Sequence, residues 1–427
     1  MKEHKAHVTP AWVLHPDITS DRSRRSAKSA LAEAVALAAA LPGLEVKGSN
    51  VVRLPKPHAG ALFGSGKIEE LKTIFKENEI ELVLVDGPVS PVQQRNLEKT
   101  WGVKLLDRTG LILEIFSDRA ATREGVLQVE MAALTYQRTR LVRAWTHLER
   151  QRGGLGFVGG PGETQIEADR RAIDEQLVNL RRQLDKVVKT RSLHRAARAK
   201  VPYPIVALVG YTNAGKSTLF NRLTGADVMA KDMLFATLDP TMRSVKLPDG
   251  PDVILSDTVG FISDLPTELV AAFRATLEEV LAADLILHVR DISHAATEEQ
   301  AKDVREILSS LGVTGTTPLL EVWNKIDAMP EEDRVAAVAR AERDDSVFAT
   351  SALTGDGLDT LLAAVNRILE GDRREDTLHL TFDEGRKRAW LFDKALVEEE
   401  TQTDTGYTVR VRWSAKDARQ FETLKYS

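Results

Sequence analysis

Cysteine is absent from this 427-residue chain, and so are long hydrophobic runs. Without cysteine there are no disulfides and no thiolate-bound metal ions, which is typical of a protein from a reducing cytosol. No run approaches the roughly 20 apolar residues that cross a membrane as a helix. The most apolar stretch, ALAEAVALAAALPGL, contains Glu33 and is better interpreted as a buried helix. Because MKEHKAH leads into no apolar segment, we expect no secretory signal, no membrane span and a cytoplasmic protein.

An excess of charge of one sign is also lacking, because the formal net charge is only −5 at pH 7. This average argues against a general nucleic-acid-binding protein, but it conceals a basic block. Residues 138–200 hold 15 Lys and Arg against 7 Asp and Glu, a local net charge of +8. Such a local excess predicts contact with nucleic acid. The alternative is a solvent-exposed helix face, and composition alone leaves both interpretations open.

The length of the chain predicts roughly two to four domains. We divide it into the units 1–125, 126–200, 201–371 and 372–427. The first unit mixes a short apolar strand at 81–87 with helical patterns at 25–40 and 67–78, which predicts a small α/β subdomain. Residues 103–116 predict a strand, a turn and an apolar helix. The last unit is expected to be a small α+β domain, with a helix in RAWLFDKALVEEE and a strand in GYTVRVRW.

The second unit carries two long helical patterns whose apolar residues are spaced mostly by three or four. They run from 127 to 148 and from 166 to 187, and both are typical of helices that pack as a coiled coil. Between them, GGLGFVGGPGETQ (153–165) is too rich in glycine for a helix. We therefore expect an antiparallel helical hairpin with this loop at its tip.

The third unit alternates strand and helix patterns, which is typical of a parallel sheet. Its strand candidates are 205–210, 252–257, 285–291, 318–324 and 347–351.

GYTNAGKST (210–218) matches G-x-x-x-x-G-K-[ST] and lies between a predicted strand and a predicted helix. Backbone N–H groups of such a loop wrap phosphate oxygens at a helix N-terminus. Lys216 is expected to reach the outer phosphates and Ser217 to ligate Mg²⁺. The expected nucleotide contacts here are Gly210, Tyr211, Thr212, Asn213, Ala214, Gly215, Lys216, Ser217 and Thr218. A second Gly-Lys pair in ALFGSGKIEE lacks the first glycine and the hydroxyl, so we interpret it as a helix start.

DTVG (257–260) follows a strand and lies 41 residues after Lys216. Asp257 is expected to hold Mg²⁺ through a water molecule, and the Gly260 N–H to contact the γ-phosphate. The expected contacts in this motif are Asp257, Thr258, Val259 and Gly260. The next residue is Phe261, where many related switches place a glutamine that orients the attacking water. Because an apolar side chain cannot do this, intrinsic hydrolysis is expected to be slow.

NKID (324–327) follows the apolar stretch PLLEVW, and TSAL (350–353) lies further on. A carboxylate such as Asp327 accepts both the ring N–H and the exocyclic amine of guanine, a pair that adenine lacks. Lys325 can lie over the base, and TSAL can contact the guanine oxygen through its backbone. The expected base contacts are Asn324, Lys325, Ile326, Asp327, Ser351, Ala352 and Leu353.

Between the phosphate loop and DTVG, one threonine is expected to close over Mg²⁺ when the γ-phosphate is bound. LFATLDPT offers Thr237 and Thr241, and we favour Thr237 because it lies 21 residues after Lys216. The expected contacts in this segment are Phe235, Ala236, Thr237, Leu238 and Asp239.

Together these elements resemble a P-loop GTPase of the translation-factor and Era-like class. Longer stretches narrow the resemblance to the HflX family of ribosome-associated GTPases. These are LLDRTGLILEIFSDRAATREGVLQVEMAAL (105–134), GGPGETQIEADRR (159–171), GYTNAGKSTLFNRLTGADV (210–228) and LFATLDPT. The predicted fold class is α/β, a P-loop GTPase domain with an N-terminal α/β subdomain, a helical hairpin and a small C-terminal α+β unit.

The resemblance implies a GTPase that uses Mg²⁺ and binds the large (50S) ribosomal subunit and its RNA. It implies a hairpin loop that reaches toward the peptidyl-transferase centre, and splitting of stalled or idle ribosomes under stress, controlled by GTP. Phe157, the aromatic residue of the loop, either stacks on an RNA base or anchors the loop on its own domain. We expect the protein to be a monomer.

The expected catalytic residues are Lys216, Thr237, Gly260 and Asn213. Some similar GTPases use an asparagine at the position of Asn213 to hold K⁺ near the phosphates. The alternative is that Asn213 only hydrogen-bonds the loop and the switch segment. Because Phe261 cannot orient water, we expect large ribosomal subunits to stimulate hydrolysis by reordering the switch segments.

Two other functions stay open. One is a regulatory GTPase that acts on a protein effector without RNA, which the basic hairpin argues against. The other gives the N-terminal subdomain an ATP-driven activity of its own, although no Walker motif supports it.

Overall fold

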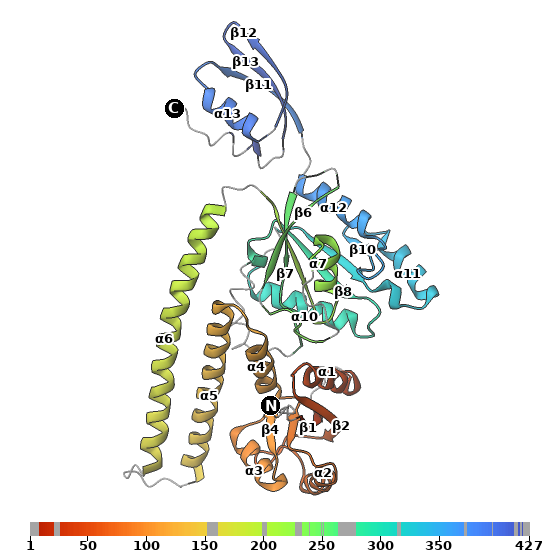
Figure 1. Ribbon diagram of the computed structural model, residues 1–427. Helices are drawn as coiled ribbons and strands as arrows, with labels where there is room; N and C mark the ends of the chain where they lie inside the picture. The colour runs from red at the N-terminus through yellow and green to blue at the C-terminus, as the bar shows by residue number, and fades with distance from the viewer. Residues whose placement is uncertain are drawn as a thin grey trace, which may run out of the picture.

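The structure, a computed structural model, contains three β-sheets, each built from a separate part of the chain (Figure 1). The residues that it describes are 8–20, 26–151, 161–198, 203–226, 233–238, 240–248, 250, 252–263, 279–313, 317–370, 374–394, 396–413, 417–418 and 421.

The first sheet has four parallel strands in the order β2-β1-β3-β4. Its elements are β1 (Thr9–Ile18), α1 (Ala27–Ala39), β2 (Leu44–Leu54), α2 (Ser65–Glu77), β3 (Leu82–Val85), α3 (Pro91–Trp101), β4 (Lys104–Asp107) and α4 (Arg108–Arg119). Separate apolar clusters cover its two faces. One contains Phe75 of α2 and Trp101 of α3, and the other contains Leu37 of α1 and Phe116 of α4. The predicted α/β subdomain is thereby confirmed.

Short sequence signals set the ends of these helices. At the start of α3, the Gln93 N–H donates to Ser90 Oγ at 3.2 Å, and the Ser90 N–H donates to Gln93 Oε1 at 2.9 Å. Asp107 ends β4 and also caps α4, because its Oδ1 accepts from the Gly110 N–H at 2.9 Å. The turn predicted between this strand and this helix is therefore wrong, since one capping carboxylate joins the two directly.

The second unit is the predicted helical hairpin, made of α5 (Arg123–Gln151) and α6 (Pro161–Arg198), which run side by side in Figure 1. Leu127, Leu177 and Leu180 are buried, and Arg138 Nε lies 2.8 Å from Asp174 Oδ1 across the pair. The loop predicted at 153–165 was too long at its C-terminal end, because α6 already begins at Pro161. Residues 161–165 are helical because a proline is well suited to the first position of a helix. Phe157 lies outside the described residues.

The third unit has a six-stranded sheet in the order β10-β9-β8-β5-β7-β6, parallel except for β6. Its elements are β5 (Ile205–Gly210), α7 (Lys216–Thr224), β6 (Thr241–Lys246), β7 (Asp252–Asp257), β8 (Leu285–Asp291), α10 (Thr297–Ser310), β9 (Leu319–Asn324), the 3-10 helix η1 (Ile326–Ala328), α11 (Glu331–Ala341), β10 (Val347–Ala349) and α12 (Leu358–Glu370). The predicted strands are present, and β10 is shorter than expected. The sequence patterns did not reveal β6, which pairs antiparallel with β7 at the edge.

The last unit is a three-stranded antiparallel sheet in the order β11-β13-β12, with the helix 385–393 packed on it. Its elements are β11 (Arg374–Thr381), α13 (Gly385–Asp393), β12 (Val397–Thr403) and β13 (Gly406–Trp413). The helix predicted to continue through VEEE was wrong. Residues 397–400 form a strand because they pair with β13, and this pairing overrides the helix preference of glutamate.

Candidate functional site

The phosphate loop, residues 211–215, joins β5 to α7 and packs against the end of β9. Gly215 has φ of +91°, a conformation that favours glycine, and a Cβ there would lie 2.2 Å from Asn324 Nδ2. Asn324 Nδ2 donates to the Ala214 carbonyl at 2.9 Å, and Asn324 Oδ1 accepts from the Ala352 N–H at 2.9 Å. Both polar atoms of Asn324 are thus engaged within the protein. Asn324 therefore joins the phosphate loop to the predicted base-binding segment TSAL through hydrogen bonds. The NKID motif alone did not reveal this role.

Lys216 begins α7 and is buried. Its Nζ donates to the carbonyls of Gly210 at 3.2 Å and of Tyr211 at 2.8 Å. Burial lowers the pKa of Lys216 to about 8, while nearby Asp257 opposes this shift and Lys325 adds to it. The ammonium group is therefore held at the loop that wraps the expected phosphates.

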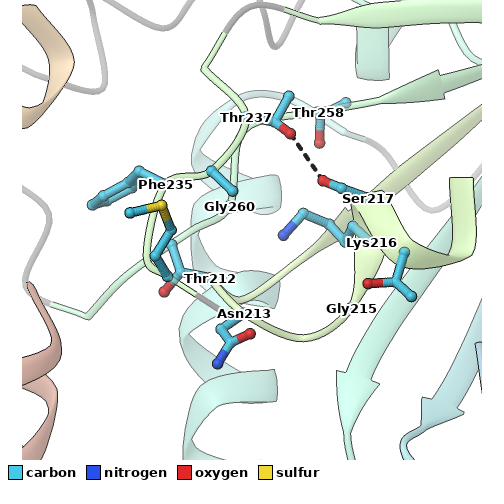
Figure 2. Close-up of a pocket in the computed structure, with 12 residues that line it drawn as sticks. Thr212, Asn213, Gly215, Lys216, Ser217, Phe235, Thr237, Thr258 and Gly260 are labelled. Carbon is cyan, nitrogen blue, oxygen red and sulfur yellow. Dashed lines mark hydrogen bonds between the residues drawn. The ribbon is translucent and has the colours of Figure 1, made fainter. Parts of the chain in front are cut away.

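Three oxygen-bearing side chains meet beside the loop (Figure 2). Ser217 Oγ lies 2.8 Å from Thr237 Oγ1, the pair joined by the dashed line in Figure 2. Both hydroxyls donate to Asp257 Oδ2, which the figure does not draw, at 2.7 Å and 3.0 Å. The other carboxylate oxygen of Asp257 is buried with no hydrogen-bond partner among the described residues. Burial raises the pKa of Asp257, and Lys216 and the two hydroxyls oppose this shift. Hydroxyl and carboxylate oxygens are the protein ligands that Mg²⁺ prefers, so this donor set fits that ion.

Phe261 follows DTVG and connects two parts of the site through its backbone. The Thr212 N–H donates to the Phe261 carbonyl at 2.7 Å, and the Phe261 N–H donates to the Gly210 carbonyl at 3.1 Å. A Cβ at Gly260 would lie 2.8 Å from Thr212 Cα, so glycine is required for this close approach. The Phe261 ring is only 1% exposed and belongs to the same buried apolar cluster as Phe116 of α4. Its side chain is therefore part of a packed core that both subdomains share.

A pocket opens above the loop, and Figure 2 shows Lys216 and Ser217 directed into it. Its lining includes many of the predicted phosphate-side residues: Thr212, Asn213, Gly215, Lys216, Ser217, Thr218, Phe235, Ala236, Thr237, Thr258 and Gly260. Thr237, rather than Thr241, lies at the oxygen cluster. Asp239 lies outside the described residues.

The predicted base-binding segments lie together at the other side of the phosphate loop. Ser351 Oγ donates to Asp327 Oδ1 at 2.5 Å, which fixes one carboxylate oxygen of the exposed Asp327. Ile326 and Ala352 are buried, so they anchor these two segments in the interior of the domain. Leu353 is 70% exposed, and its carbonyl accepts from Arg222 Nη1 at 3.2 Å.

A buried polar network, which the sequence patterns did not reveal, joins the phosphate loop to the N-terminal subdomain. The Tyr211 hydroxyl hydrogen-bonds Glu33 of α1 and accepts from the Ser263 N–H at 2.8 Å. Arg108 of α4 donates to Glu33 at 2.6 Å and to the Ser263 carbonyl at 2.8 Å. Arg108 also donates to Asp86 at 2.5 Å. No local signal could have predicted these bonds, because Tyr211 and Glu33 are 178 residues apart in the chain.

Burial disfavours the charged forms in this network, and ion pairing restores them. Opposing its burial, hydrogen bonds and charges from His15 and Arg108 lower the pKa of Asp86 below its usual value. Burial also opposes the charge of Arg108, but Asp86 and Glu33 raise the pKa of its guanidinium above the ordinary value. Asp86 and Arg108 therefore form a buried ion pair at neutral pH, and each charge depends on its partner.

The described part of the chain contains no helix that is long and apolar enough to span a membrane.

Four protein-family profiles match successive parts of the chain. Residues 28–117 match "GTP-binding GTPase N-terminal", and residues 119–198 match "GTP-binding GTPase Middle Region". Residues 205–325 match "50S ribosome-binding GTPase", and residues 336–424 match "HflX C-terminal domain".

Curated relatives match over most of the chain. The GTPase HflX of Magnetococcus marinus is 50% identical over 386 residues, which cover 90% of this chain and 87% of that protein. The GTPase HflX of Escherichia coli K12 is 45% identical over 367 residues, which cover 85% of each chain. Among solved structures, a GTP-binding protein of Sulfolobus solfataricus in complex with GDP is 22% identical, with a TM-score of 0.45 over 84% of this chain and 98% of that one. On the identities to the two HflX relatives and on the family profiles, the chain is a GTPase that belongs to the HflX family.

Proposed function

We propose that the enzyme hydrolyses GTP in the pocket above the phosphate loop. Lys216 contacts the outer phosphate oxygens, and the Gly260 N–H contacts the γ-phosphate. Ser217, Thr237 and, through a water molecule, Asp257 would hold Mg²⁺, which would supply positive charge beside the phosphates. The hydrogen-bonded cluster of these three side chains supports the assignment, because it brings together oxygens from three separate segments.

The same proposal assigns guanine recognition to the ends of β9 and β10. Asp327 accepts from the two N–H groups at the guanine edge, and Lys325 covers the face of the base. The backbone N–H groups of Ala352 and Ser351 are assigned to the guanine oxygen. They already donate to Asn324 Oδ1 and to the Asp356 carbonyl, so the base would share these donors. The Ser351–Asp327 hydrogen bond of 2.5 Å supports this assignment, because it holds the carboxylate in one orientation.

We further propose that the hairpin binds the RNA of the large ribosomal subunit. α6 has 38 residues, and a helix of this length extends about 57 Å. Exposed basic side chains on it include Arg181, Arg182 and Lys186. Such a long basic probe suits a narrow, RNA-lined cleft, since phosphate contacts dominate the affinity for RNA.

Splitting of stalled or idle ribosomes in the cytoplasm under stress is the activity that we propose for the GTP-bound protein. One observation carries this proposal. Val129 and Ala132, in the N-terminal part of α5, lie in the same buried cluster as Phe235 of the switch segment and Phe261. Closure of the switch segments around GTP can therefore reposition the hairpin through packed side chains, because a close-packed core transmits small displacements.

Co-sedimentation of the full chain with large ribosomal subunits at graded salt tests the RNA-binding part. We expect binding that weakens as salt rises, and weaker binding with a shallower salt slope for R181Q/R182Q. The matched control, R181K/R182K, preserves the charges and should bind like the parent. A protein that acts only on a protein effector would not co-sediment, and this result would exclude the ribosomal function.

Potassium is a separate point of the proposal. Asn213 lines the pocket and has φ of +59°, so its backbone adopts a conformation that is uncommon outside glycine. We propose that it helps to hold K⁺ beside the phosphates. Equal hydrolysis rates in K⁺ and Na⁺ buffers would leave Asn213 with a role in the loop alone.

A further inference from the structure

Asp291 lies at the carboxyl end of β8, beside the NKID motif, and no motif of the sequence includes it. The parallel register of β8 and β9 places Asp291 directly opposite Asn324. The ladder continues one residue further, because the Ile292 N–H donates to the Asn324 carbonyl at 3.0 Å. The Asp291 carboxylate is therefore fixed next to the residue that follows, Lys325.

Each oxygen of Asp291 has its own partners. Oδ1 accepts from the Ser293 N–H at 3.1 Å and from Ser293 Oγ at 2.6 Å. Oδ2 lies 2.9 Å from Lys325 Nζ. The serine fixes the orientation of the carboxylate, so the second oxygen presents a defined acceptor to the lysine.

Lys325 is held at both ends. Its backbone adopts φ of +65°, which is uncommon for a residue with a side chain, and its carbonyl accepts from the Ala328 N–H at 3.0 Å. Lys325 Cε would lie 3.9 Å from a Cβ at Gly215, so the methylene stem passes beside the phosphate loop. With its ammonium group on Asp291, the stem of Lys325 runs from this carboxylate past Gly215 of the phosphate loop.

We propose that Asp291 is a positioning residue for guanine nucleotides, which acts by holding the Lys325 stem against the face of the base. This inference rests on the base site proposed above and adds a residue to it. Asp327 hydrogen-bonds the edge of guanine, which distinguishes this base from other purines. Asp291 acts through Lys325 on the face of the base, which all purines share. The two carboxylates therefore have separable effects on binding.

Asp291 offsets part of the charge of Lys325 and draws its ammonium group to the β8 side. Without this carboxylate, Lys325 loses the contact that fixes its side chain.

The ion pair is partly open to solvent, with side-chain exposures of 28% for Lys325 and 15% for Asp291. Solvent screens a partly exposed pair, so its loss should cost less than that of a fully buried one. We therefore expect the D291A variant to fold like the parent and to differ in nucleotide binding.

The test measures the affinities of the full-length protein for GDP, for a non-hydrolysable GTP analogue and for inosine diphosphate, which lacks the exocyclic amine. For D291A we expect all three affinities to fall about tenfold, with their ratios preserved, because uniform binding is lost. D291N keeps the acceptor for Ser293 and removes the charge, so an intermediate loss is expected. D327A should instead abolish the preference for GDP over inosine diphosphate.

A double-mutant cycle with K325A separates positioning from a merely structural role. We expect K325A to weaken GDP binding and D291A to add nothing in the K325A background. If D291A weakens binding equally in both backgrounds, Asp291 does not act through Lys325 and the inference is overturned. An effect of K325A without any effect of D291A also overturns it, while leaving the base site in place. If neither K325A nor D327A alters binding, the proposed guanine site itself is wrong.

Discussion

Phe235 of the switch segment meets Phe116 of α4 edge to face, with ring centroids 4.8 Å apart and planes at 82°. Phe235 is 2% exposed and has φ of +55°, a backbone conformation that costs free energy in a bulky residue. The contact with Phe116 helps to maintain it. Two residues later, Thr237 reaches the Ser217–Asp257 cluster, so docking of the ring and closure of the threonine belong to one local conformation.

Replacing Phe116 with leucine should therefore loosen the switch segment while keeping the core apolar. We expect the affinity for a GTP analogue to fall about fivefold relative to that for GDP, because only the GTP state needs Thr237 closed. Phe63→Leu is the matched control, since Phe63 is equally buried in the cluster on the other face of the sheet. An unchanged ratio of the two affinities in F116L would show that α4 has no influence on the switch.

Removing the hydroxyl of Tyr211 should destabilise the protein. In Y211F the Ser263 N–H loses its acceptor and Glu33 loses a hydrogen bond inside a buried network, at a cost of about 1–3 kcal/mol in the free energy of unfolding. Tyr203→Phe, at a position 43% exposed, should change it by less than about 0.5 kcal/mol. Urea denaturation monitored by circular dichroism measures both. Equal stabilities of the two variants would mean that the network contributes nothing to folding.

Stability should fall in mild acid because of His288 in β8. Burial lowers the pKa of His288 to about 4, with Arg290, Arg305 and Lys216 adding to the shift and Glu321 opposing it. The unfolded chain has the ordinary pKa near 6.5 and binds the proton more readily, so the contribution is complete above about pH 6.5 and is lost as pH falls toward 4. We expect the parent to lose about 1–2 kcal/mol of unfolding free energy between pH 7 and pH 5 through this group.

The H288Q variant should lose correspondingly less over the same pH interval. The exposed His379 provides the control, because H379Q should keep the slope of the parent. Denaturation midpoints at pH 7, 6 and 5 give the comparison. A slope in H288Q as steep as that of the parent would place the acid sensitivity elsewhere.

The oxygen cluster predicts a sharp difference between two neighbouring threonines. T237A should lower the GTP hydrolysis rate about 100-fold, since an interaction needed in the transition state is lost, while GDP affinity stays unchanged. T241A should have little effect, because Thr241 begins β6 and its hydroxyl is not part of the Ser217–Thr237–Asp257 cluster. Removal of divalent ions with a chelator should reduce the parent to the level of T237A. Similar rates for T237A and T241A would contradict the assignment of Thr237.

The parts of the site that the sequence predicted are those encoded within one short segment. The phosphate loop, DTVG and NKID each carry their chemistry in four to nine neighbouring residues. The alternation of strands and helices places all three at the carboxyl ends of parallel strands. Other features depend on residues far apart in the chain: the hydrogen bonds of Asn324 to two loops, the Phe116–Phe235 contact and the pairing of VEEE with β13. Local propensity carries no information about such partners, so these features required the fold.

Sedimentation profiles of intact ribosomes mixed with the protein test the central claim most directly. The account predicts that a non-hydrolysable GTP analogue converts intact ribosomes into subunits as well as GTP does in a single round, whereas GDP does not. Binding in the GTP state would then do the mechanical work, and hydrolysis would reset the protein. Intact ribosomes that persist with saturating protein and either GTP or the analogue would contradict the account.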